Sequence, residues 1–134
     1  MPARSARGAP DVLLLDTSFL VEFEAEVCGS KAGAATSVLA SRRSAPVAIS
    51  IVTLGEFAQR FSDVESLNAF VSHFRVIQLS RVIAWRMAWL QSSLARRLGE
   101  NAAWIAATAL AYGATLVARD NAFARVPRLD YLRF

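Results

Sequence analysis

Short apolar runs alternate with longer amphipathic segments along the chain. The clearest run covers residues 12–15, which are all apolar and have an aspartate on each side. Continuous runs of this length are typical of strands buried on both faces of a parallel sheet. Three later segments and the C-terminal stretch indicate further strands: residues 47–52, residues 76–79, residues 114–118 and, as an edge strand, part of residues 123–134.

Helical periodicity fills the intervals between these strands. Polar residues that can cap a helix follow the first strand, and apolar positions then recur at helical spacing from Phe19 to Phe23. The alternation of strand and helix predicts an α/β fold, an α/β/α sandwich with a short, mostly parallel sheet of four to five strands. Further helices are expected at residues 37–43, 53–61, 63–74, 81–98 and 102–112, with a capping box at Thr53 and Glu56, an N-cap at Asn101 and C-caps at Gly99 and Gly113.

Composition limits the class of protein. The chain of 134 residues fits one domain, predicted at residues 11–134 after a flexible tail at residues 1–10. The contents of 54% apolar and 19% charged residues exclude general disorder. The net charge is +4, and arginine supplies 14 of the 15 basic residues, so the chain is compatible with an RNA or DNA partner.

Cysteine usage and the apolar stretches indicate the compartment. Cys28 is the one cysteine, so the chain cannot form an intramolecular disulfide or a thiolate zinc cluster, and a reducing, cytoplasmic setting is expected. The longest uncharged stretch, residues 101–118, approaches the length of a membrane span. Gly113 divides it into a helix and a strand, so no membrane association is expected.

Three carboxylates follow predicted strands. Asp16 comes directly after the first strand, Glu56 lies just past the second, and Asp120 lies just past the fourth. If these strands are neighbours, the side chains converge at one edge of the sheet. Converging carboxylates repel one another unless a cation is present, and oxygen ligands suit Mg²⁺ or Mn²⁺. Each residue also has a structural interpretation, as a helix cap or turn residue, and both interpretations stay open.

Four segments, in this order and spacing, resemble one known family. They are Asp16-Thr17-Ser18 after an apolar strand, residues 50–56 (SIVTLGE), residues 104–109 (WIAATA) and residues 113–120 (GATLVARD). The chain is similar to the PIN-domain ribonucleases, above all to the VapC-like toxins of bacterial type II toxin-antitoxin systems. The resemblance implies a single α/β/α domain, Mg²⁺- or Mn²⁺-dependent cleavage of RNA, a homodimer, and inhibition by a small antitoxin protein.

One position departs from the family pattern. The acidic cluster of the family usually has four members, and the third opens the helix shortly before the Ile-Ala-Ala segment, at the position of Ala102. Alanine cannot bind a metal, so the catalytic set of Asp16, Glu56, residue 102 and Asp120 is incomplete. The favoured explanation is an engineered replacement of an aspartate, with natural loss of activity as the second. Substitution by Glu100 ranks last, because a residue two positions away projects from a different side of a helix.

The leading hypothesis is a metal-dependent endoribonuclease toxin, impaired by Ala102. Asp16, Glu56 and Asp120 would hold the ion. Thr17 and Ser50 would orient its ligands or a water, and Arg119 would contact a substrate phosphate.

Two other functions are kept open. The first is a catalytically inactive PIN-like module that binds a protein partner or RNA. It is suggested by Trp85 and Trp89, which lie one helical turn apart near Arg96. A neighbouring helix of the same chain could equally cover both tryptophans. The second and weaker alternative is a phosphatase with Asp16 as nucleophile, and it expects an acid at position 18, which is serine.

Overall fold

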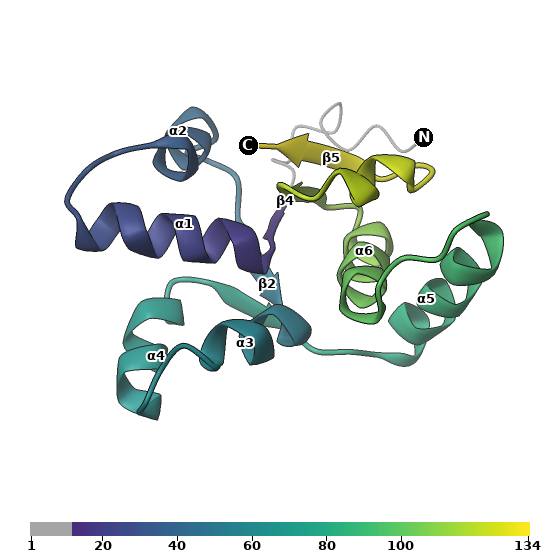
Figure 1. Cartoon of the computed structure of the whole chain (residues 1–134), viewed down its shortest axis with the longest axis horizontal. Helices are drawn as coiled ribbons and strands as arrows, with labels where there is room; N and C mark the ends of the chain where they lie inside the picture. The colour runs from purple at the N-terminus through teal and green to yellow at the C-terminus, as the bar shows by residue number, and fades with distance from the viewer. Residues whose placement is uncertain (1–11) are drawn as a thin grey trace.

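A five-stranded sheet forms the centre of the structure, a computed structural model that describes residues 12–134 (Figure 1). The strands lie in the order β3-β2-β1-β4-β5, and every neighbouring pair is parallel. The predicted tail at residues 1–10, and Asp11, lie outside the described residues. The strands are β1 (Leu13–Leu15), β2 (Val47–Ser50), β3 (Arg75–Ile77), β4 (Thr115–Ala118) and β5 (Asp130–Arg133).

Helices cover both faces of this sheet, as a parallel sheet requires (Figure 1). One face packs against α1 (Thr17–Cys28), α2 (Ala34–Ser41), α3 (Ile51–Ala58) and α4 (Val64–Val71). The other face packs against α5 (Arg81–Ser93), α6 (Glu100–Tyr112) and the 3-10 helix η2 (Asn121–Arg125). The predicted α/β/α sandwich with a parallel sheet is therefore confirmed, and the predicted edge strand is β5.

β1 is buried on both of its faces. Leu14 packs into the core beneath α5 and α6, whereas Leu13 and Leu15 pack into the core beneath α1, α3 and α4. Successive side chains of a strand point to opposite faces, so one short leucine run contributes to both cores. This is why the continuous apolar run predicted the central strand correctly.

The connections between strands change direction in the middle of the sheet. From β1 the chain moves outward to β2 and β3, and it then returns to β4 on the other side of β1. The carboxyl ends of β1 and β4 therefore lie side by side, while the segments that follow them leave toward opposite faces. In parallel sheets a reversal of this kind leaves a crevice in which ligands bind.

α3 begins earlier than the sequence predicted. Ser50, the last residue of β2, is its N-cap, and Ser50 Oγ accepts a hydrogen bond from the backbone N–H of Val52 at 3.0 Å. The predicted capping box at Thr53 and Glu56 was wrong, because Thr53 lies inside the helix. Its buried hydroxyl has no hydrogen-bond partner in the described chain. The β-branched residues after Ser50 favoured a longer strand, but the cap ends the strand first.

α5 ends at Ser93 and not at the predicted residue 98. The buried amide of Gln91 holds the next loop, because it donates to the backbone O of Leu98 and accepts from the Leu98 N–H, both at 2.9 Å. Leu98 is therefore buried although it lies outside the helix. The buried positions of the sequence thus keep the spacing that a helix extending to residue 98 would have. Gly99 is the N-cap of α6 and not a C-cap of α5. Gly113 ends α6 as predicted, at a φ of 59° that favours glycine.

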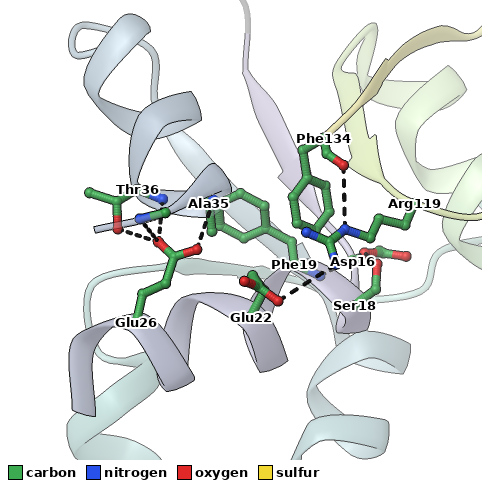
Figure 2. A network of polar contacts seen from close by, with 10 residues as sticks. Asp16, Ser18, Phe19, Glu22, Glu26, Ala35, Thr36, Arg119 and Phe134 are labelled. Carbon is green, nitrogen blue, oxygen red and sulfur yellow. Dashed lines mark hydrogen bonds and ion pairs between the residues drawn. The ribbon is translucent and has the colours of Figure 1, made fainter. Parts of the chain in front are cut away.

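The side chain of Glu26 in α1 caps the neighbouring helix α2 (Figure 2). Its carboxylate accepts hydrogen bonds from the backbone N–H groups of Gly33 and Ala35 at 3.0 Å and of Thr36 at 2.8 Å, and from the Thr36 hydroxyl. A Cβ on the N-cap residue Gly33 would come within 2.7 Å of this carboxylate. The hydrogen bonds, led by that of the Thr36 hydroxyl, lower the pKa of Glu26 to about 2.

Replacing Glu26 with glutamine should weaken this cap, because the amide keeps one accepting oxygen but loses the negative charge and the second acceptor. The folded-state pKa lies below the usual 4.5, so the ionised carboxylate stabilises the fold above pH 4.5, and this contribution disappears as the pH falls toward 2. Glu26→Gln is expected to lower Tm at pH 7 and to flatten the fall of Tm between those two pH values, as measured by circular dichroism. Glu65→Gln, at an exposed position of α4, is the matched control. Equal effects of the two variants would contradict the capping role.

Candidate functional site

A pocket of about 420 Å³ lies at the carboxyl ends of β1 and β4, where the connections reverse. The start of α1, the helices α3 and α6, and the segment after β4 all contribute to its lining. The structure thus brings together the three predicted metal-binding carboxylates and Ala102. The lining residues are Asp16, Thr17, Ser18, Glu56, Ala102, Ile105, Arg119, Asp120 and Phe123.

Asp16 follows β1 directly and is the N-cap of α1. Its Oδ1 accepts hydrogen bonds from Ser18 Oγ at 2.6 Å and from the backbone N–H of Phe19 at 3.1 Å (Figure 2). The residue is only 8% exposed, and this burial raises the pKa of its carboxyl above the usual 3.8. The hydrogen bonds oppose the increase, and the nearby charge of Glu56 adds to it. A cation in the pocket would offset the cost of ionising this buried group.

Glu56 is half-buried in α3 and is held at both carboxylate oxygens. Oε1 accepts a hydrogen bond from the hydroxyl of Thr17, the first residue of α1. Oε2 accepts a hydrogen bond from Asn101 Nδ2 at 2.9 Å, in the first turn of α6. Glu56 therefore connects α1, α3 and α6. The role of Thr17 in orienting a metal ligand stays a prediction, and this contact is consistent with it.

Asp120 follows β4 and is the N-cap of η2, with Oδ1 accepting a hydrogen bond from the Ala122 N–H at 2.9 Å. The hydroxyl of Tyr131 in β5 donates to the backbone O of Asp120 at 2.9 Å. Burial raises the pKa of Tyr131, and the charges of Asp16 and Asp120 raise it further, while Arg133 has the opposite effect. Tyr131 therefore remains protonated near two of the pocket carboxylates and supports the turn that carries Asp120.

The pocket fits a divalent ion by the type of its donors but does not form a closed cluster. Within residues 12–134, no three acidic, histidine or cysteine side chains lie close enough together to hold an ion directly. The hydrogen bonds of Asp16 and Asp120 described above use only Oδ1 of each carboxylate. Ala102 contributes a methyl group to the lining. Hard oxygen donors around one pocket suit Mg²⁺ or Mn²⁺, because these ions keep several waters and need few direct protein ligands.

The other predicted site residues lie in different surroundings. Ser50 is fully buried as the N-cap of α3 and does not line the pocket. Arg119 does line the pocket, but its guanidinium lies 4.3 Å from the ring centroid of Phe134 and 3.6 Å from Glu22 Oε1 (Figure 2). Its contact with a phosphate, and the role of Ser50, stay predictions. Glu100 is exposed and does not line the pocket.

Two residues near the site were not predicted to have a function. Asn101 was interpreted as a helix cap, although Gly99 holds that position. The one signal available in the sequence was that Asn101 directly precedes position 102, which is acidic in the family pattern. Tyr131 had no signal in the sequence, because its contact with Asp120 exists only when β5 pairs with β4.

The fold and the pocket define a parallel α/β domain with acidic side chains at the reversal point of its sheet. Comparison with protein families then gives a direct match, because the model of the PIN domain family matches residues 13–129. The chain belongs to the PIN domain family. No match was found among curated proteins.

Solved structures of toxin-antitoxin proteins have similar folds. VapBC2 from Rickettsia felis, bound to a promoter DNA fragment, gives a TM-score of 0.74 at 22% identity, over 92% of this chain and 98% of that one. VapBC-1 from nontypeable Haemophilus influenzae gives a TM-score of 0.72 at 19% identity, over 91% of this chain and 97% of that one. A toxin-antitoxin complex from Klebsiella pneumoniae gives a TM-score of 0.67 at 27% identity, over 87% of this chain and 94% of that one. The fold is VapC-like, and the family resemblance predicted from the sequence is confirmed.

Replacing Asp16 with asparagine should stabilise the protein at neutral pH. The folded-state pKa lies above 3.8, so the protonated form favours folding below that pH, and the benefit is lost as the pH rises through the folded-state pKa. Asparagine caps a helix as well as aspartate does and avoids burying a charge. In EDTA, Asp16→Asn is expected to raise Tm at pH 7, with a difference that shrinks toward pH 3.8.

Asp63→Asn is the matched control, because Asp63 is the exposed N-cap of α4. Hydrogen bonds from Ser66, first of all from its backbone N–H, lower the pKa of Asp63. The ionised form therefore stabilises the fold, and Asp63→Asn should lower Tm at pH 7. Tm changes of the same sign in both variants would contradict the interpretation of Asp16.

Proposed function

We propose that the chain is a metal-dependent endoribonuclease toxin of the VapC type and that Ala102 impairs it. One observation carries the proposal: Asp16, Glu56, Asp120 and Ala102 line a single pocket where the strand order reverses. Ribonuclease activity is typical of the PIN domain family to which the chain belongs. RNA is the proposed substrate, in keeping with the net charge of +4.

Asp16, Glu56 and Asp120 would hold Mg²⁺ or Mn²⁺ in this proposal, some of them through water molecules that the ion keeps, because the three carboxylates do not form a closed cluster. When bound, the ion would lower the pKa of a water molecule and neutralise charge that develops on the phosphodiester. The chain itself presents the carboxylates in fixed orientations, through the cap of α1, the donors on Glu56 and the cap of η2. Arg119 would exchange its contact with Glu22 for a substrate phosphate. Because both side chains of this ion pair are partly exposed, the exchange costs little.

Ala102 is the proposed defect in the site. It lies in the first turn of α6 and lines the pocket together with Ile105, one turn later in the same helix. A carboxylate at this position would face the same space as the other three. It would also benefit from the partial positive charge of the helix N-terminus. The methyl group of alanine offers neither a ligand nor a charge.

The Ala102→Asp variant tests the proposal. It is expected to cleave single-stranded RNA in Mn²⁺ at least about 100-fold faster than the unchanged chain, since loss of a direct ligand should exceed the effect of losing a supporting group. EDTA should abolish the cleavage. Mn²⁺ should also raise Tm of the variant, because an ion that binds only the folded state stabilises it.

Ala102→Asn is the matched control, because it adds a side chain of the same shape without the charge. It should recover much less activity than Ala102→Asp. A folded Ala102→Asp variant that neither cleaves RNA nor binds Mn²⁺ would count decisively against the proposed function.

A second candidate is an inactive PIN-like module that binds RNA or a protein. The observation in its favour is the outer side of α5, where Trp85 and Trp89 are 73% and 50% exposed. No helix of the described chain covers these side chains, so covering by a neighbouring helix, one of the two open interpretations, does not occur in residues 12–134. In this case Ala102→Asp stays inert, and RNA binding persists in EDTA.

A cognate antitoxin and a second copy of the chain are the proposed protein partners. The antitoxin is proposed because the similar Klebsiella pneumoniae structure is a toxin-antitoxin complex. The second copy is proposed because Val82, Trp85 and Trp89 form an exposed stripe along α5, and large exposed apolar side chains mark interfaces.

The proposed location is the cytoplasm. None of the helices in residues 12–134 has the length and apolar character needed to cross a bilayer.

Removing the tryptophans should weaken self-association. In sedimentation velocity, the chain with Trp85→Ser and Trp89→Ser is expected to shift from dimer toward monomer. Its Tm extrapolated to low protein concentration should change little, because both side chains are exposed. Val64→Ser, at an exposed apolar residue of α4, is the control. A dimer that survives the double substitution would place the interface on another surface.

A further inference from the structure

Asn101 links the first turn of α6 to the carboxylate of Glu56. Its Nδ2 donates to Glu56 Oε2 at 2.9 Å, and the Thr17 hydroxyl donates to Oε1 of the same carboxylate. Thr17 directly follows Asp16, and Asn101 directly precedes Ala102. The two hydrogen bonds therefore hold the Glu56 carboxylate next to the start of α1 and next to the start of α6.

Helix capping does not explain this contact. Gly99 is the N-cap of α6, and Asn101 already lies within the first turn of the helix. Its hydrogen bond reaches a residue 45 positions away in a different helix. Holding an exposed side chain in one rotamer costs conformational entropy, and the stability of α6 alone gains nothing from this bond. What the bond does fix is the orientation of Glu56.

We propose that Asn101 is a positioning residue of the metal site and acts through Glu56. This inference rests on the proposed function, in which Glu56 is a metal ligand. The amide suits the role, because it donates to the carboxylate without carrying a charge. A lysine or arginine would neutralise Glu56 and compete with the cation, and an aspartate would repel it. Groups that hydrogen-bond a metal-binding carboxylate fix its orientation and raise metal affinity.

The same contact relates positions 56 and 102. Glu56 belongs to α3 and Ala102 to α6, two helices that are separate in the sequence and that pack together near the pocket. Because Asn101 is adjacent to Ala102, its bond to Glu56 holds the start of α6 against α3. A carboxylate restored at position 102 therefore depends on Asn101 for its position relative to Glu56.

The experiment measures Mn²⁺ binding by calorimetry in the full chain carrying Ala102→Asp, with the metal alone as probe. Asn101→Ala is expected to raise the Kd for Mn²⁺ by about 10- to 100-fold. Asn101→Gln keeps the amide donor on a longer side chain and should recover part of this loss. Asn68→Ala, at an exposed asparagine of α4, is the matched control and should leave the Kd unchanged. Melting curves in EDTA establish that each variant is folded.

The outcomes separate this inference from the proposed function. If the Ala102→Asp parent binds Mn²⁺ and Asn101→Ala does not change its Kd, the positioning role is overturned and the proposed function stands. Equal losses in Asn101→Ala and Asn101→Gln also overturn the role, because the amide donor is then not what matters. If the parent does not bind Mn²⁺ at all, the proposed function fails, and the positioning role fails with it.

Discussion

The parallel pairing of β1 with β4 joins the two halves of the sheet, and the site depends on it. The register sets Leu15 beside Val117, and the backbone N–H of Asp16 extends the pairing with a hydrogen bond to Val117 O at 3.2 Å. Asp16 and Asp120 thereby lie at the same edge, on neighbouring strands. Ser50 ends β2 on the other side of β1, and the cap it forms starts α3, the helix that carries Glu56. A shift of this register by one residue would separate the acidic residues, because it would turn every side chain of the shifted strand to the opposite face of the sheet.

Two buried carboxylates show how the surroundings decide between structure and function. Glu26 and Asp16 are both 8% exposed, yet their pKa values shift in opposite directions. Glu26 accepts hydrogen bonds from three backbone N–H groups and a hydroxyl, so its negative charge is well stabilised. Asp16 has fewer donors and lies near Glu56, so burial outweighs its hydrogen bonds. Asp16 can therefore cap α1 and still gain from a cation, and its two interpretations do not exclude each other.

Much of the candidate site could be predicted, because it follows strand ends that apolar runs reveal. The element boundaries were less predictable, since neighbouring residues offer competing caps. Ser50 starts α3 before Thr53 can, and Gly99 starts α6 where a C-cap of α5 was expected. The loop held by Gln91 buries Leu98 as a longer helix would have done, so the apolar spacing was the same for both structures.

The sequence by itself determined the fold class, the central strand, the family pattern and the exceptional alanine at position 102. These features depend on local periodicity and residue identity, which need no knowledge of the chain's path. Only the tertiary structure decided the order of the strands and the partners of the polar side chains. Asn101 meets Glu56 because α6 packs near α3, and Tyr131 meets Asp120 because β5 pairs with β4. No local pattern encodes such contacts, because each joins residues that are adjacent only after the sheet has assembled.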